Sequence, residues 1–169
     1  MKKNKISKNW VNKQRRDIYV RQSKVDGYRA RSAYKLIEID EKFKIFKGGL
    51  SVIDIGAAPG SWSQYSLKVI KNGKLISIDL KPMEPIGNSI QIQGDFTEGK
   101  IQDEIKNSLT AKVDVILSDM AVNTTGIKNI DSIQTGELCK EAMLFAKEMI
   151  KENGYFISKI FMGGTFNEI

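Results

Sequence analysis

The sequence contains no histidine and a single cysteine, Cys139. Without histidine the chain lacks the commonest general base and the commonest metal ligand, so any proton transfer must use Lys, Asp, Glu or Tyr. One cysteine excludes an internal disulfide framework and a metal cluster held by several cysteines. No apolar run approaches the ~20 residues of a membrane-spanning helix. These absences predict a protein that uses neither a metal nor a membrane.

The charge of the chain is distributed unevenly along its 169 residues, a length that suits one domain. Residues 1–50 hold 15 Lys/Arg against 5 Asp/Glu, a net of +10, whereas residues 51–169 hold 12 against 15, a net of −3. We therefore predict a basic segment over residues 1–25 that contacts the phosphates of a nucleic acid, followed by a catalytic core over 26–169 of the same domain. A solvated leader or a targeting peptide is the alternative.

Residues 51–62, SVIDIGAAPGSW, combine a short apolar strand, a turn of small residues and the start of a helix. Strand–turn–helix units of this kind bind adenosine-containing ligands at the helix N-terminus. Gly56 and Gly60 are spaced G-x-x-x-G, which differs from the G-x-G-x-x-G of dinucleotide sites, and Pro59 lacks a donor that a pyrophosphate would need. The turn therefore favours S-adenosylmethionine, which has no phosphate. Close packing of helix on strand is the competing explanation.

The remainder of the chain alternates strand and helix patterns. We predict helices over 31–43, 101–109 and 130–151, with Gly48-Gly49 and Asn153-Gly154 ending the first and last, and further strands over 74–80, 89–93, 113–117 and 155–161. Five strands joined by helical crossovers predict an α/β fold, a Rossmann-like, mostly parallel sheet with helices on both faces.

Four aspartates end or closely follow separate predicted strands, where parallel sheets bind their ligands: Asp54, Asp79, Asp95 and Asp119. Asp79 follows Gly56 by 23 residues, near the ~20 typical of an acid that binds ribose hydroxyls. Asp95 and Phe96 would bind and cover the adenine amino group, although capping of the next helix also explains Asp95.

Lys159 lies inside the predicted strand over 155–161. Lysine is rarely buried without a partner, because an unpaired charge in an apolar setting costs several kcal/mol. Two explanations are open. In the first, the strand is at the edge of the sheet and its lysine faces water. In the second, desolvation lowers the pKa of the lysine, an acid such as Asp119 tunes it, and the lysine serves as a base.

Several stretches together resemble the FtsJ-type (RrmJ-like) RNA 2′-O-ribose methyltransferases along essentially the whole chain: residues 27–36, 54–65, 79–80 with 82–83, 94–96, 118–121 with 123–126, and 159–161. The resemblance implies that Lys35, Asp119 and Lys159 are the first three members of a Lys-Asp-Lys-Glu set around the reacting hydroxyl. Lys159 would be the base, Asp119 would orient it, and Lys35 would hold the target ribose. The cofactor cleft for S-adenosylmethionine would be formed by Gly56, Gly60, Trp62, Asp79, Asp95, Phe96 and Asp119.

The resemblance also implies a partner, ribosomal RNA or the large ribosomal subunit, with a uridine of the A-loop as target. We expect a monomer in the cytoplasm, with a mitochondrion or another organelle as the alternative location. Competing functions are methylation of a tRNA anticodon loop, RNA binding without catalysis, and a nicotinamide oxidoreductase, which the turn spacing disfavours.

In the family that this chain resembles, one sheet edge is closed by a further helix and two strands, and this part carries the Glu of the Lys-Asp-Lys-Glu set. Glu168 is too near Lys159 in the sequence to replace that Glu. We therefore expect the native protein to continue by about 35 residues.

Overall fold

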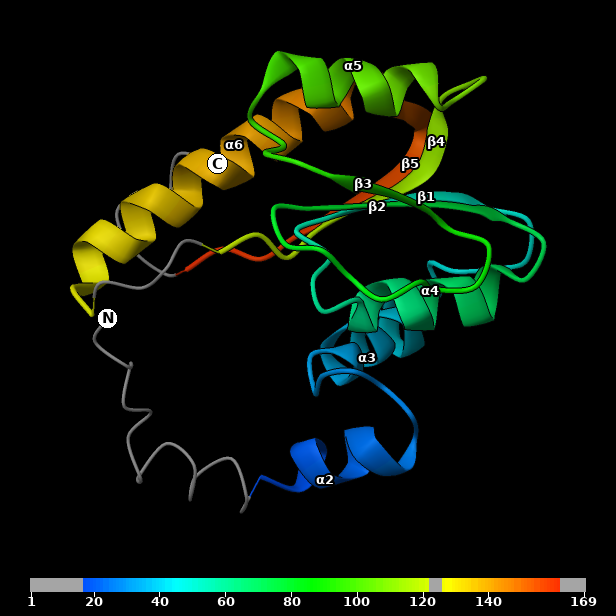
Figure 1. Cartoon of the computed structure of the whole chain (residues 1–169), viewed down its shortest axis with the longest axis vertical. Helices are drawn as coiled ribbons and strands as arrows, with labels where there is room; N and C mark the ends of the chain where they lie inside the picture. The colour runs from blue at the N-terminus through cyan, green and yellow to red at the C-terminus, as the bar shows by residue number, and fades with distance from the viewer. Residues whose placement is uncertain (1–16, 122–125, 162–169) are drawn as a thin grey trace.

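The computed structural model describes residues 17–121 and 126–161, with the side chains of residues 128 and 129 left out. A five-stranded parallel sheet lies between two layers of helices (Figure 1). Helices α5 and α6 cover one face, α3 and α4 cover the other, and α2 lies outside α3. The elements are α2 (Ile18–Val25), α3 (Ala33–Phe43), β1 (Ser51–Ile55), α4 (Ser61–Ile70), β2 (Lys74–Asp79), β3 (Ile90–Gln93), α5 (Gly99–Asn107), β4 (Val113–Ser118), α6 (Lys128–Met149) and β5 (Ile150–Ser158).

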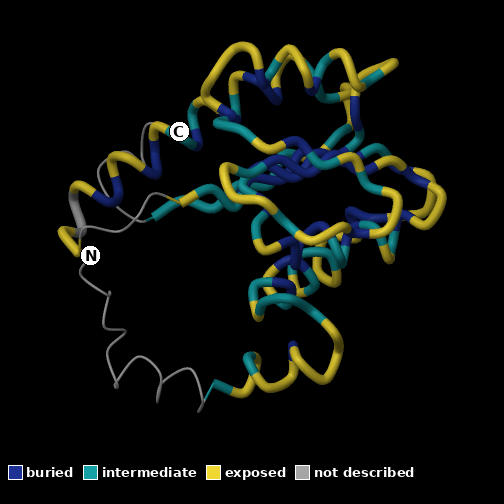
Figure 2. The backbone as a smooth tube through the Cα atoms, viewed as in Figure 1, coloured by how far each residue is buried: buried dark blue, intermediate teal, exposed yellow. Residues whose placement is uncertain are grey.

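The strand order is β3-β2-β1-β4-β5, and every neighbouring pair is parallel. The predicted Rossmann-like α/β fold is thereby confirmed. Because β1 is central, its residues alternate between two cores on opposite faces of the sheet. Ile53 and Ile55 pack beneath α5 and α6, whereas Val52 packs beneath α3 and α4. Figure 2 shows the buried backbone concentrated in the sheet and on the inner sides of the helices.

The helix predicted over 31–43 ends where expected, but the residues predicted to stop it, and the predicted end of the helix over 130–151, are wrong. Helix α3 ends at Phe43, because Lys44 adopts a left-handed conformation with φ 53° and closes the helix before Gly48-Gly49. Helix α6 ends at Met149, and Gly154 lies inside β5. A Cβ atom on Gly154 would lie 2.8 Å from the carbonyl oxygen of Asp114, so this glycine permits close approach to β4.

The predicted final strand also ends earlier, at Ser158. Lys159 therefore follows the strand, and its backbone N–H donates to the carbonyl oxygen of Ser118 at 2.9 Å. Most of the predicted basic segment, residues 1–16, lies outside the described residues, as do residues 122–125 of a family-like stretch and Glu168. The described helices include none that is long and apolar enough to cross a membrane.

Candidate active site

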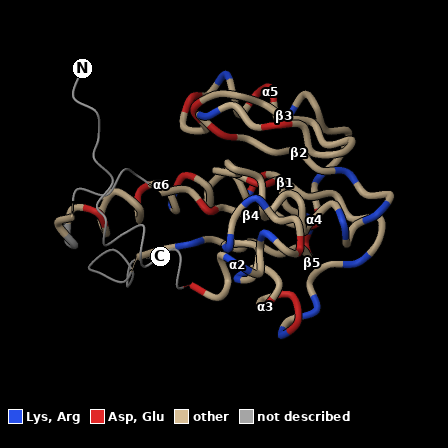
Figure 3. The backbone as a smooth tube through the Cα atoms, turned by 60° about the horizontal axis from the view of Figure 1, so that its bottom comes forward, with Lys and Arg blue, Asp and Glu red and all other residues tan. Residues whose placement is uncertain are grey.

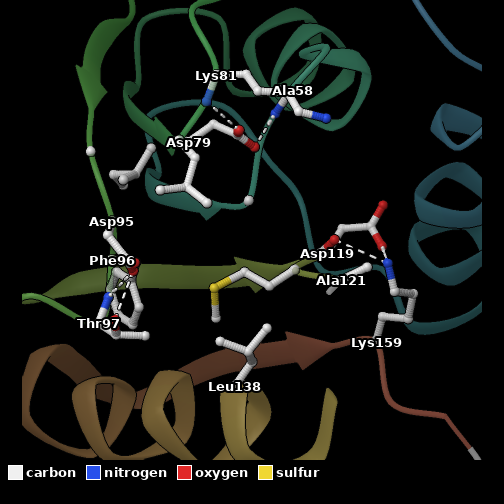
Figure 4. Close-up of a pocket in the computed structure, with 15 residues that line it drawn as sticks. Ala58, Asp79, Lys81, Asp95, Phe96, Thr97, Asp119, Ala121, Leu138 and Lys159 are labelled. Carbon is white, nitrogen blue, oxygen red and sulfur yellow. Dashed lines mark hydrogen bonds and ion pairs between the residues drawn. The ribbon is translucent and has the colours of Figure 1, made fainter. Parts of the chain in front are cut away.

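A cavity of about 630 Å³ lies at the carboxyl end of the sheet, a size typical of small-molecule sites. Its lining comes from the segments that follow β1, β2, β3, β4 and β5, with Leu138 of α6 closing one side (Figure 4). Parallel strands end together at this edge, so segments far apart in sequence meet there. Six of the predicted site residues line the cavity: Gly56, Asp79, Asp95, Phe96, Asp119 and Lys159.

Asp79, the last residue of β2, is held by backbone N–H groups on both of its carboxylate oxygens. Oδ2 accepts a hydrogen bond from the N–H of Ala58 at 2.8 Å, and Oδ1 accepts one from the N–H of Lys81 at 2.8 Å. The first bond ties the end of β2 to the turn after β1. Each oxygen keeps a second lone pair, so the fixed carboxylate can still accept hydrogen bonds from a ribose.

Asp95 and Phe96 follow β3 and form the opposite wall of the cavity (Figure 4). Oδ1 of Asp95 accepts hydrogen bonds from the hydroxyl of Thr97 at 2.7 Å and from its N–H at 2.9 Å, and these bonds lower the pKa of Asp95. Asp95 does not cap α5, whose N-cap residue is Glu98. Phe96 packs edge to face on Phe145, which fixes its ring beside the cavity.

Asp119 and Lys159 form an ion pair at the edge of the cavity (Figure 4). The Nζ atom of Lys159 lies 2.5 Å from Oδ1 of Asp119 and donates a second hydrogen bond to the carbonyl oxygen of the same residue at 3.0 Å. The side chain of Lys159 is 23% exposed and that of Asp119 is 21% exposed. The explanation that Lys159 is an edge-strand lysine facing water is wrong: β5 is at the sheet edge among the described strands, but Lys159 follows it and faces Asp119 and the cavity. Its role as a base stays a prediction.

Gly56 and Gly60 are required by backbone geometry as well as by space. Gly56 has φ 75°, and a Cβ atom there would lie 2.9 Å from the backbone N and Cα of Met120. Gly60 has φ 103°, and its Cβ atom would lie 2.5 Å from the side chain of Ile86 and 3.0 Å from that of Arg29. Left-handed φ values favour glycine. Gly56 lines the cavity, whereas Gly60 starts α4 behind it.

Three other predicted site residues lie outside the cavity lining. Besides Gly60 these are Trp62 and Lys35. Trp62 is buried in the core beneath α3, and its indole N–H donates to the carbonyl oxygen of Ser32 at 2.8 Å. Lys35 lies on α3 with its side chain exposed. The structure therefore gives Trp62 a packing role, and a direct contact between Trp62 and the cofactor has no support in this geometry.

Asp54 differs from the other three aspartates because it lies within β1 and is fully buried. Its Oδ2 accepts a hydrogen bond from the hydroxyl of Ser63 at 2.6 Å, whereas Oδ1 has no partner among the described residues. Burial, assisted by the charges of Asp119 and Asp79 and opposed by the Ser63 bond, raises the pKa of Asp54 to about 7. Asp54 is therefore buried in the sheet next to the cavity and does not line it.

Arg29 lies outside the cavity lining but holds together two loops around it, a role that the sequence reasoning missed. Its guanidinium donates to the carbonyl oxygens of Pro59 at 3.1 Å, Glu84 at 2.8 Å and Pro85 at 2.9 Å. These bonds join the turn after β1 to the loop after β2, the two segments that Asp79 also links. An arginine can satisfy three carbonyls because its guanidinium has five N–H donors. The sequence placed Arg29 in the family-like stretch 27–36, but nothing in the local pattern indicated these three carbonyl partners.

The model of the FtsJ-like methyltransferase family matches residues 28–169. The chain belongs to this family. It is 70% identical to ribosomal RNA large subunit methyltransferase E of Pelagibacter ubique, covering 100% of this chain and 83% of that protein. The protein of the same name from Rickettsia akari is 47% identical, with 96% and 74% covered. The crystal structure of a Plasmodium falciparum ribosomal RNA methyltransferase is 38% identical and has a TM-score of 0.77, with 83% and 82% covered.

The family identifies the protein as a methyltransferase that uses S-adenosylmethionine, and it rules out a nicotinamide oxidoreductase. The cavity fits this cofactor. Asp79 and Asp95 offer fixed acceptors for hydroxyl and amino groups, and three carboxylates suit a ligand that carries a sulfonium and an ammonium. In the described ranges, no group of three or more His, Cys, Asp or Glu side chains is placed to hold a metal ion.

Proposed function

We propose that this protein transfers the methyl group of S-adenosylmethionine to the 2′-oxygen of a ribose in ribosomal RNA. The observation that carries the proposal is the Asp119–Lys159 pair at the edge of the cofactor cavity, 2.5 Å between Oδ1 and Nζ. Relatives that are 70% and 47% identical are named ribosomal RNA large subunit methyltransferases, which supports the RNA substrate. A uridine of the A-loop is our proposed target, and the tRNA anticodon loop is the alternative.

The chemistry requires alignment of the 2′-hydroxyl and removal of its proton. The cofactor supplies an electrophilic methyl group when bound. Lys159 would accept the proton of the 2′-hydroxyl as that oxygen takes the methyl group and the cofactor leaves as the neutral thioether. Asp119 holds Nζ through its carboxylate and its main-chain carbonyl, so the amine has a defined position. Holding the reacting atoms about 3–3.5 Å apart can supply much of the rate enhancement.

Lys35 and the basic segment would hold the RNA. Lys35 is exposed on α3, outside the cavity lining, so a role on the target ribose requires the RNA to bridge α3 and the cavity. Arg31 is engaged in an ion pair with Asp17, and Arg29 bonds three carbonyls. Arg21, Lys24 and Lys35 are exposed basic side chains of α2 and α3 that we assign to phosphate contacts. The monomeric state and the cytoplasmic location stay predictions.

The deciding experiment compares Lys159→Ala, Lys159→Arg and a matched control, Lys100→Ala. Lys100 is an exposed lysine in the first turn of α5 that pairs with Glu98 and does not line the cavity. Methyl transfer to large-subunit RNA should fall at least about 100-fold in both Lys159 variants, because arginine cannot supply a neutral base. Calorimetry should show cofactor affinity within a few-fold of wild type, and the control should keep full activity. The labelled RNA is then digested to nucleosides to locate the methyl group.

Two results would refute the proposal. A Lys159→Ala variant that turns over within a few-fold of wild type would remove Lys159 from the mechanism. A methyl group found on a base, with unmodified ribose, would assign a different reaction to the same cavity. Parallel assays with transfer RNA decide between the two RNA classes.

A further inference from the structure

Five exposed lysines lie at the end of the sheet opposite the cavity, where the strands begin. We call them the amino-end lysines: Lys44, Lys47, Lys71, Lys74 and Lys112. They belong to the segments that lead into β1, β2 and β4, which are adjacent in the sheet. Figure 3 shows basic stretches along the loops to the right of the sheet, the side away from the carboxyl ends of the strands.

Backbone contacts bring these segments together. Lys74 pairs in register with Ser51, and its N–H donates to the carbonyl oxygen of Leu50 at 3.0 Å. The N–H of Gly49 donates to the carbonyl oxygen of Ile70 at 2.8 Å, which draws the 44–50 segment to the end of α4. Because these bonds lie in ordered turns, the lysine positions are set by the fold.

The local charge balance is strongly positive. The segments at this end, 44–50, 71–74, 108–112 and 150–154, contain six lysines and one acid, Glu152. One of the six, Lys151, is paired with Asp114 at 2.7 Å, and Asp114 also accepts a hydrogen bond from the N–H of Ser51. Across the described residues, none of the amino-end lysines forms an ion pair with a carboxylate. Lys47 does lie near enough to Asp114 for its charge to help lower the pKa of that carboxyl, but it forms no ion pair with it, so all five lysines remain exposed to a partner.

Helix dipoles account for part of this pattern only. Lys44 and Lys71 follow the C-termini of α3 and α4, where a positive charge stabilises the helix by ~0.3–1 kcal/mol. Lys47 and Lys112 precede strands, Lys74 is the first residue of β2, and none of the three gains from a helix terminus. Clustered like charges repel one another and carry a cost in the free protein. A polyanionic partner would offset that repulsion.

We propose that the amino-end lysines bind the phosphate backbone of a second segment of the RNA substrate, away from the nucleotide that is methylated. The inference rests on the proposed function, because it assumes an RNA substrate. The five residues of β1 alone span ~17 Å, so an RNA whose target nucleotide occupies the cavity must extend at least that far around the molecule to reach the amino-end lysines. A folded ribosomal RNA is large enough to reach both ends.

The test uses two RNAs, a full-length transcript of large-subunit RNA and a short stem-loop that contains the methylated nucleotide. The variant is Lys47→Gln/Lys74→Gln, which leaves the left-handed Lys44 and Lys71 unchanged. The matched control is Lys100→Gln/Lys106→Gln on α5, which removes the same charge. If both lysines contact phosphates, affinity for the long RNA at 0.15 M salt falls roughly 5-fold per contact, and the salt slope falls by ~1.8.

The expected result is a loss of roughly 10–30-fold for the long RNA in the Lys47/Lys74 variant, no change for the stem-loop, and a smaller loss in the control. The rate of methyl transfer at saturating RNA should match wild type. The proposal is refuted if the Lys47/Lys74 variant and the Lys100/Lys106 control bind the long RNA equally well. It is also refuted if the Lys47/Lys74 variant loses the same affinity for the stem-loop as for the long RNA. Binding of wild type, and not the variant, to anionic phospholipid vesicles without any RNA effect would assign the surface to membranes instead. Failure of wild type to methylate either RNA refutes the proposed function separately.

Discussion

The buried carboxyl of Asp54 should make the stability of this protein decrease as pH rises toward neutrality. Asp54 is 0% exposed, one of its oxygens has no hydrogen-bond partner among the described residues, and the other accepts a bond from Ser63. Burial, assisted by the charges of Asp119 and Asp79, raises the pKa of Asp54 to about 7 from an ordinary value of 3.8. The native state therefore keeps a proton over a pH range in which the unfolded chain has released it.

The sign and size follow from proton linkage. Between pH 3.8 and about 7 the unfolded chain binds fewer protons at this residue than the native protein does, so the free energy of unfolding falls as pH rises. The slope approaches 1.4 kcal/mol per pH unit in the middle of this range, and the total approaches about 4 kcal/mol at pH 7. Above pH 7 both states are ionised, and the Asp54 contribution stops changing.

The variant Asp54→Asn keeps the shape of the side chain and cannot ionise. Its unfolding by urea is compared with that of wild type at pH 5 and pH 8, and the difference in free energy should shift in favour of the variant by about 3 kcal/mol. Asp103→Asn, a change on the exposed face of α5, should show no such shift. A difference between Asp54→Asn and wild type that is the same at both pH values would refute the reasoning, because the buried carboxyl would then not be protonated in the native state.

Two further substitutions test how the site is built. Gly56→Ala should weaken binding of S-adenosylmethionine by about 1–3 kcal/mol, since the new Cβ would meet the backbone of Met120 at 2.9 Å and the φ of 75° is strained for alanine, and an unchanged calorimetric affinity would contradict this. Trp62→Phe should lower stability by about 1 kcal/mol through loss of the bond to the Ser32 carbonyl, with cofactor affinity unchanged. Weaker cofactor binding at unchanged stability would contradict this and would show that Trp62 contributes to the cofactor site.

The sheet and its ligand edge could be predicted from the sequence because both depend on local patterns. Short apolar runs alternating with amphipathic segments predict strands and crossovers, and parallel strands carry their following residues to one edge. Asp79, Asp95, Asp119 and Lys159 were found in this way, and all four line the cavity. The pattern placed Lys159 inside a strand, whereas the strand ends one residue earlier, at Ser158. Its position at the ligand edge of the sheet was nevertheless predicted correctly.

The failures share a cause: a residue type can have two structural reasons that look alike in sequence. Gly154 looked like a helix end but allows β5 to approach the carbonyl of Asp114. Asp54 looked like a strand-end ligand, yet a shift of one residue along a strand changes the face on which a side chain lies. Arg29 bonds carbonyls about 30 and 55 residues away, and only the folded chain reveals such partners. Local pattern cannot specify contacts of that range.

The carboxylates that suit the cofactor would repel the RNA backbone. Asp79, Asp95 and Asp119 line one cavity, and their negative charge complements a sulfonium and an ammonium but opposes phosphate. Lys159 pairs with Asp119, and Lys81 is the second lysine of the lining, so the three carboxylates still outnumber the lysines. RNA affinity must therefore come from lysines and arginines outside the cavity, on α2 and α3 and, as we propose, among the amino-end lysines. Because those residues take no part in proton transfer, a variant that binds RNA weakly can still transfer methyl groups at the wild-type rate once RNA is saturating.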